Sequence, residues 1–198
     1  MNHSASLIST PPGAAARDPS ERQRARSRAT GVLVMSVFGV LWAAGGLLLS
    51  GNPGWGWIVV ASLLVALVAH AVKLLRANPR AREPLAADQV ERQRRAGRIF
   101  LWTGVAEGVG IFLAVNVVLN LGHPEWRAAA MMVVVGLHFL PLAIAFGYRP
   151  HLVTGLVMTA WALGYPWLFA AGALAPMGLF GAAAILFASA AWALRSLR

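Results

Sequence analysis

The stretch that decides the fold is IFLWTGVAEGVGIFLAVNVVLNL, residues 99–121, in which Glu107 is the one charged side chain. A helix needs about 20 mainly apolar residues to cross the hydrocarbon layer of a bilayer, and this stretch is long enough. Its residues do not alternate between polar and apolar as the strands of a membrane barrel do. The stretch therefore predicts a transmembrane α-helix, whose backbone polar groups are all paired within the segment.

Five further apolar runs of similar length accompany this one. The predicted spans are residues 31–50, 55–75, 99–121, 127–147, 151–171 and 174–194. Hydrophobic residues make up 58% of the chain and charged residues 12%, a composition that leaves no room for a water-soluble domain. The predicted fold is all-α, a six-transmembrane-helix bundle over residues 31–198. Residues 1–30, rich in Arg, Ser and Pro, are expected to form a disordered basic tail.

The basic residues predict the orientation of the bundle. All but one of the 17 Lys and Arg residues fall on one side of the six predicted spans, and Arg127 is the exception. Because short cytoplasmic loops carry an excess of Lys and Arg, both termini are predicted to be cytoplasmic. The connections on the other side are short, so the spans are expected to pair as three helical hairpins.

A basic cytoplasmic loop over residues 76–98 separates the second and third predicted spans, and it is expected to contain a Pro-broken stretch followed by a short helix with Asp88 as its N-cap. Two interpretations of its arginines stay open: a solvated cytoplasmic loop, or a surface that binds anionic lipid headgroups. The residues assigned to headgroup binding are Arg92, Arg94, Arg95 and Arg98. The net charge of +10 does not indicate nucleic-acid binding, because the cations sit in short stretches between apolar runs.

Glu107 and His138 are the strongest candidates for a functional site. A carboxylate exposed to lipid costs several kcal/mol, so Glu107 is expected to face the bundle interior or a wet cavity. His138 lies at nearly the same predicted depth in the next span, so the two are expected to be partners, and Thr103 shares the face of Glu107. The sequence leaves open whether the pair is a proton-coupled ligand site or a structural contact that fixes helix register.

An aromatic stripe follows one face of the fifth predicted span. Trp161 and Tyr165 lie on it together with Thr154 and Met158, at offsets that return to nearly the same angle of a helix. The stripe predicts either the aromatic wall of a ligand cavity or ordinary helix packing.

The sequence contains no pattern for a cofactor, a metal or an intramembrane enzyme. No cysteine is present, which excludes thiolate metal sites and cysteine nucleophiles. Glu107 and His138 could act as an acid and a base, but they lack an obvious nucleophile or metal set. Glycine-rich helix faces permit either packing within the chain or formation of a homo-oligomer.

Two resemblances are carried by short motifs. AEG at 106–108, VVVGLHFLPLA at 133–143 and HLVTG at 151–155 resemble uncharacterised six-helix inner-membrane proteins of bacteria, which implies that location and fold but no activity. AEGVGI at 106–111 and TAWALG at 159–164 resemble the small multidrug-resistance transporters. That likeness implies a coupling carboxylate at Glu107 and an aromatic contact at Trp161, while His138 has no counterpart in the family.

Two functions follow as hypotheses. The first is a transporter or small-molecule binder built around Glu107, His138, Thr103, Trp161 and Tyr165, with a ligand that the sequence does not identify. The second is a noncatalytic membrane scaffold or accessory subunit, in which Glu107 and His138 are structural.

Overall fold

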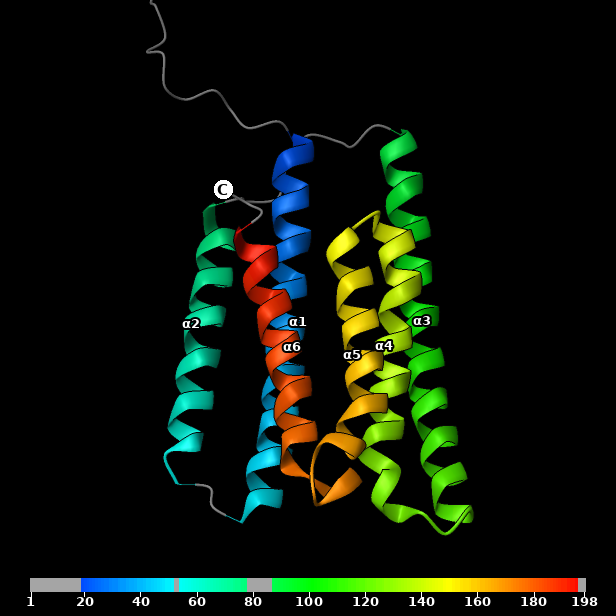
Figure 1. Cartoon of the computed structure of the whole chain (residues 1–198). Helices are drawn as coiled ribbons and strands as arrows, with labels where there is room; N and C mark the ends of the chain where they lie inside the picture. The colour runs from blue at the N-terminus through cyan, green and yellow to red at the C-terminus, as the bar shows by residue number, and fades with distance from the viewer. Residues whose placement is uncertain (1–18, 52–53, 78–86, 196–198) are drawn as a thin grey trace, which may run out of the picture.

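The computed structural model describes residues 19–51, 54–77 and 87–195. Within these residues it contains helices and no strands (Figure 1). The α-helices are α1 (Pro19–Ser50), α2 (Gly56–Ala77), α3 (Ala87–Asn120), α4 (Arg127–Phe146), α5 (Arg149–Leu168) and α6 (Pro176–Arg195). Two short 3-10 helices, η1 (Pro124–Trp126) and η2 (Gly172–Leu174), lie in the connections before α4 and α6. The all-helical class predicted from the sequence is confirmed.

Five of the six α-helices are long and apolar enough to cross a membrane, and α5 is not one of them. The five are α1, α2, α3, the η1–α4 segment and α6. The 20-residue α5 has the length of a span but carries two prolines, a histidine and an arginine, which lower its hydropathy. Membrane character is therefore established by helix length and composition for every α-helix except α5.

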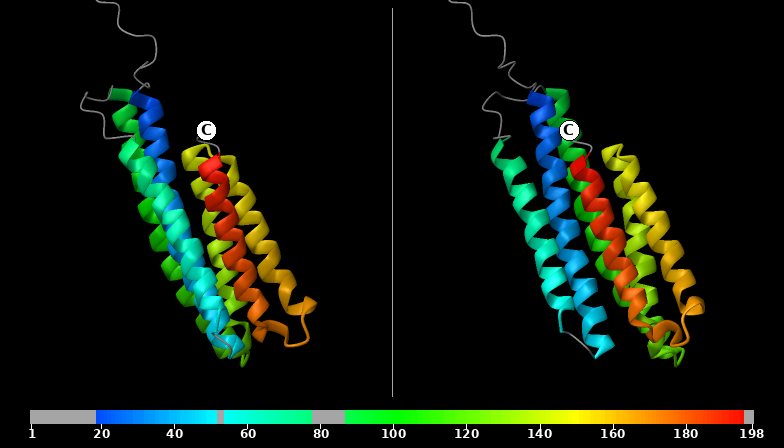
Figure 2. Two further views of the ribbon diagram at one scale, coloured as in Figure 1. Left: turned by 90° about the vertical axis from the view of Figure 1, so that its left-hand side faces the viewer. Right: turned by 60° about the vertical axis from the view of Figure 1, so that its left-hand side comes forward.

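The six α-helices lie side by side in an order that differs from their order in the chain (Figures 1 and 2). Contacts between elements give the row α2, α1, α6, α5, α4, α3. The most extensive contact joins α1 to α6, the first and last helices. Helices α2 and α3 thus occupy the two ends of the row, and no described residue of α3 is buried.

Small residues bring α1 and α6 together. A Cβ added to Gly39 would lie 2.8 Å from the ring of Phe187, and one added to Gly46 would lie 2.8 Å from the ring of Phe180. An aromatic ring of α6 thus packs against each of these two glycines of α1. Small residues permit this close approach between membrane helices. Ser36, fully buried in the same region, donates its hydroxyl to the carbonyl of Val32 at 2.7 Å.

Two helices begin earlier than the hydropathy of the sequence predicts. Helix α1 begins at Pro19 rather than at residue 31, and α3 begins at Ala87 rather than at residue 99. The second half of the predicted loop 76–98 is therefore the first part of α3. Ala, Arg, Gln and Glu, which dominate both extensions, are good helix formers, so the helices continue beyond the apolar segments. Residues 1–18 of the predicted tail and residues 78–86 of the predicted loop lie outside the described residues.

One end of the bundle carries most of the described cations, and we call it the basic end. At this end α1 and α3 begin, α2 and α6 end, and α4 turns into α5 (Figure 1). Its arginines include Arg76, Arg98, Arg149 and Arg195, whereas Arg127 lies at the opposite end.

Candidate functional site

Glu107 of α3 and His138 of α4 are in contact inside the bundle. Nδ1 of His138 lies 3.3 Å from Oε2 of Glu107, and the two side chains keep 13% and 18% of their surface exposed. The contact is an ion pair when the imidazole is protonated and the carboxyl group is ionised, and a hydrogen bond otherwise. Both ionisable side chains are thus largely buried, but each keeps part of its surface accessible.

Thr103 contributes its main-chain carbonyl to the same histidine. Nδ1 of His138 lies 3.3 Å from the carbonyl oxygen of Thr103, one turn before Glu107 on α3. Because a carbonyl oxygen only accepts hydrogen bonds, this contact favours a proton on Nδ1, which then faces both oxygen atoms. Thr103, Glu107 and His138 therefore form one cluster, which we call the Glu–His site.

The connection between α3 and α4 fixes the depth of this site. The two helices pack against each other and are joined through Gly122, whose φ of 78° lies in the left-handed region, and through η1. Glu107 is nine residues from Arg98 at the basic end, and His138 is eleven residues from Arg149. At about 1.5 Å of rise per residue, each lies roughly 15 Å along the bundle from the arginine named.

Trp161 and Tyr165 belong to the interface between α5 and α6. Nε1 of Trp161 donates to the carbonyl of Gly178 at 2.9 Å, and the hydroxyl of Tyr165 donates to the carbonyl of Ala173 at 2.9 Å. Tyr165 is fully buried, and its ring stacks on that of Trp161 with 6.1 Å between centroids. Among the described residues, their polar contacts lie with α6 and η2 rather than with the Glu–His site.

The other members of the stripe also face α6. Thr154 and Met158 are buried, and the hydroxyl oxygens of Thr154 and Ser189 lie 2.6 Å apart across the α5–α6 interface. The structure thus places the aromatic stripe in a packed helix interface.

His151 is a partly buried ionisable residue that the sequence analysis did not select. It lies in the first turn of α5, beyond the ring of Phe139, which contacts His138 at 5.7 Å and His151 at 5.8 Å between centroids. Nδ1 of His151 and the hydroxyl of Tyr148 are buried without a hydrogen-bond partner in the described part of the chain. The feature of the sequence that could have indicated His151 is its position directly after Pro150, at the start of an apolar run. Two histidines of neighbouring helices thus lie on either side of one phenylalanine ring.

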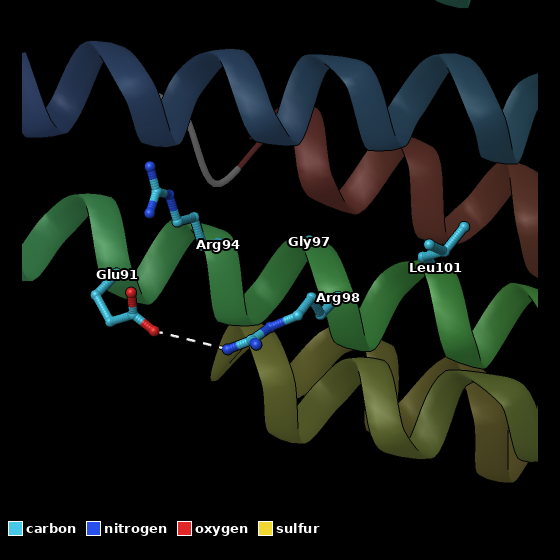
Figure 3. Close-up of a pocket in the computed structure, with 5 residues that line it drawn as sticks. All are labelled: Glu91, Arg94, Gly97, Arg98 and Leu101. Carbon is cyan, nitrogen blue, oxygen red and sulfur yellow. Dashed lines mark ion pairs between the residues drawn. The ribbon is translucent and has the colours of Figure 1, made fainter.

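The four arginines assigned to lipid headgroups lie on the first part of α3. Arg92 forms an ion pair with Asp88, and Nη2 of Arg98 lies 3.6 Å from Oε1 of Glu91. Glu91, Arg94, Gly97, Arg98 and Leu101 line an open crevice of about 450 Å³ on this helix (Figure 3).

A metal site has no support in the described part of the chain, where no three His, Asp or Glu side chains gather closely enough to hold an ion. No family model, curated protein or solved structure matches the chain. The function is therefore inferred from the geometry of the Glu–His site.

Proposed function

We propose that this chain is a multi-pass protein of a bacterial inner membrane that binds or transports a small cationic molecule at the Glu–His site. The observation that carries the proposal is the contact between Glu107 and His138 inside a bundle of membrane-type helices. Ionisable groups at such depth are costly and usually mark ligand pathways or proton relays.

The chemistry of the site suits exchange of a proton for a cation. In the charged state, the Glu107 carboxylate is neutralised by the His138 imidazolium. A bound cation would take over this neutralisation and release a proton from the pair. The residual exposure of both side chains gives a ligand a way to reach them. The resemblance of AEGVGI at 106–111 to small multidrug-resistance transporters supports an apolar cation as the ligand class.

The proposal includes six crossings arranged as three hairpins, with both termini in the cytoplasm. The gathering of arginines at the basic end supports this orientation. Helix α5 supports a sixth crossing by its length of 20 residues, about 30 Å of helix, and by its packing between α4 and α6.

Uptake of tetraphenylphosphonium into acid-loaded proteoliposomes tests the function. We expect uptake to follow the pH gradient in the wild type and to be absent in Glu107→Gln, which keeps the shape of the side chain but cannot carry the charge. Glu125→Gln is the matched control, because Glu125 lies in η1 at the opposite end and pairs with His123. Protein-free liposomes measure passive partition. Equal uptake by wild type and Glu107→Gln would refute the proposal.

A second candidate function, a noncatalytic scaffold or accessory subunit, is favoured by the position of α3. This 34-residue helix lies at the end of the row with no described residue buried, and it packs mainly on α4. Phe112 is one of its large apolar side chains and is 66% exposed. In this case the contact between Glu107 and His138 fixes the register of α3 and α4.

Purification in mild detergent with mass measurement tests this second function. A second chain, or a second copy, that co-purifies in a fixed ratio and is lost with Phe112→Ser supports it. A purely monomeric particle with pH-driven uptake would exclude it.

A further inference from the structure

The basic extension of α3 presents its arginines in different directions. At about 100° per residue, Arg98 lies about 40° from Arg94 around the helix, whereas Arg95 lies about 100° and Arg92 about 160° from Arg94. Arg92 is already paired with Asp88 one turn earlier. Arg94 and Arg98 therefore form a local cationic face, with Arg95 to one side of it and Arg92 directed away from it.

A crevice lies on this cationic face. Glu91, Arg94, Gly97, Arg98 and Leu101 line it, and its volume is about 450 Å³. Figure 3 shows the side chains of Arg94 and Arg98 leaving the helix in different directions, with the guanidinium of Arg98 turned back toward Glu91. Arg94 makes no ion pair with a carboxylate of the described residues. The crevice is thus cationic at Arg94, whose guanidinium has no acidic partner among the described residues.

Gly97 leaves the helix backbone open beside Arg94. A Cβ added to Gly97 would meet no atom within 4 Å, so the backbone is directly accessible at this point. The absence of a side chain lets a ligand in the crevice approach the helix next to Arg94.

The crevice changes from polar to apolar along the helix. Leu101, one turn beyond Gly97, is 62% exposed, and the neighbouring Trp102 is 68% exposed. Both belong to the apolar part of α3, which begins at residue 99. Exposed Trp at such a border is typical of the membrane interface. A ligand that fills the crevice therefore meets cations at one end and lipid-facing apolar groups at the other.

We propose that this crevice binds an anionic phospholipid. Arg94 and Arg98 hold the phosphate, since guanidinium groups form paired hydrogen bonds with phosphate oxygens. The phosphate draws Arg98 away from Glu91. These two residues form an exposed ion pair with 3.6 Å between the charged atoms. Gly97 accommodates the glycerol backbone, and Leu101 contacts the start of an acyl chain. The bound lipid anchors α3, the end helix that packs mainly on α4.

Titration of the detergent-purified chain with short-chain phosphatidylglycerol, read by native mass spectrometry and thermal unfolding, tests this site. Phosphatidylcholine and inorganic phosphate are the comparison ligands. We expect phosphatidylglycerol to bind and stabilise the wild type, and phosphatidylcholine and phosphate alone to have little effect. The double variant Arg94→Gln/Arg98→Gln should lose about tenfold or more in affinity, because each basic residue near a lipid surface contributes to binding.

The matched control is Arg92→Gln/Arg95→Gln, which removes the same charge from the same helix and should lose clearly less affinity, because neither arginine lines the crevice. Gly97→Leu keeps every charge and has room for its Cβ, so it should fold but fail to bind. Equal losses in the two double variants would overturn the site in favour of diffuse attraction. The site would also be overturned if Gly97→Leu bound phosphatidylglycerol as tightly as the wild type does. The same holds if inorganic phosphate alone bound and stabilised the wild type as much as phosphatidylglycerol does. None of these outcomes depends on cation uptake at the Glu–His site.

Discussion

Gly110 of α3 lies directly against Val134 of α4: a Cβ added to Gly110 would stand 2.9 Å from Cγ1 of Val134. Glu107 is three residues before this glycine, and His138 is four residues after this valine. Because the two helices are antiparallel neighbours, the close approach at Gly110 brings the next turns of both helices together. The absence of a side chain at Gly110 thus helps to position the Glu–His site.

Gly110→Val should destabilise the bundle and separate Glu107 from His138. The added atoms must push α3 away from α4, and overpacking of this kind costs about 1–3 kcal/mol. Gly108→Val is the matched control, since a Cβ at Gly108 would meet nothing within 4 Å. Thermal unfolding in detergent measures the difference between the two variants. If both unfold at the same temperature, α3 and α4 do not approach at Gly110.

The variants Glu107→Gln and His138→Asn should be coupled in their effects on stability. Residues in direct contact show interaction energies of about 0.5–3 kcal/mol in double-mutant cycles. The Glu107–His138 contact is the reason to expect a value in that range. Unfolding of the wild type, both single variants and the double variant gives the coupling energy. Strictly additive effects would mean that the two groups do not interact in the folded protein.

Tyr165→Phe should lower stability through the loss of one buried hydrogen bond. The hydroxyl donates to the carbonyl of Ala173, and its removal leaves that oxygen without this donor, at a cost of about 1–3 kcal/mol. Thermal unfolding checks the loss, and tetraphenylphosphonium uptake is measured on the same sample. A variant of unchanged stability that has lost uptake would place Tyr165 in a ligand cavity instead of the α5–α6 interface.

Single cysteines should report the orientation of the helices without background, because the chain contains none of its own. Glu125→Cys and Leu174→Cys, in or beside the connections opposite the basic end, should react with a membrane-impermeant maleimide from outside intact spheroplasts. Asp88→Cys should react only after the membrane is opened. Leu174, in η2, is the sharpest probe of α5, since its position outside requires that α5 crosses the membrane. Labelling of Leu174→Cys only after opening would contradict six crossings.

The all-helical fold could be predicted because the apolar runs are long and nearly free of charge. The contact of Glu107 with His138 could also be expected, since a short connection between antiparallel helices fixes which residues share a depth. The start of α1 could not be found in this way, nor could the continuity of the helix that begins near Asp88 with the membrane segment of α3. Hydropathy marks the part of a helix that suits lipid, and it carries no information on a helix that continues into water.

The sequence also could not show which neighbouring helix packs against the aromatic stripe of α5. Periodicity shows that Trp161 and Tyr165 share a face, but it does not identify the neighbouring helix that covers this face. The structure covers it with α6, where Gly178 and Gly181 make room for the two rings. The partial burial of His151 involves Phe139 of α4, so a pattern within α5 alone does not predict it.

The pairing of α1 with α6 bears on how the chain is made. Helix α1 is made before α6, its most extensive partner, so Phe187 and Phe180 do not cover Gly39 and Gly46 until α6 has been synthesised. This long-range contact therefore forms later than the contact of α1 with α2, its neighbour in the chain. Until α6 is present, a glycine-lined seam on α1 lacks the helix that packs against it.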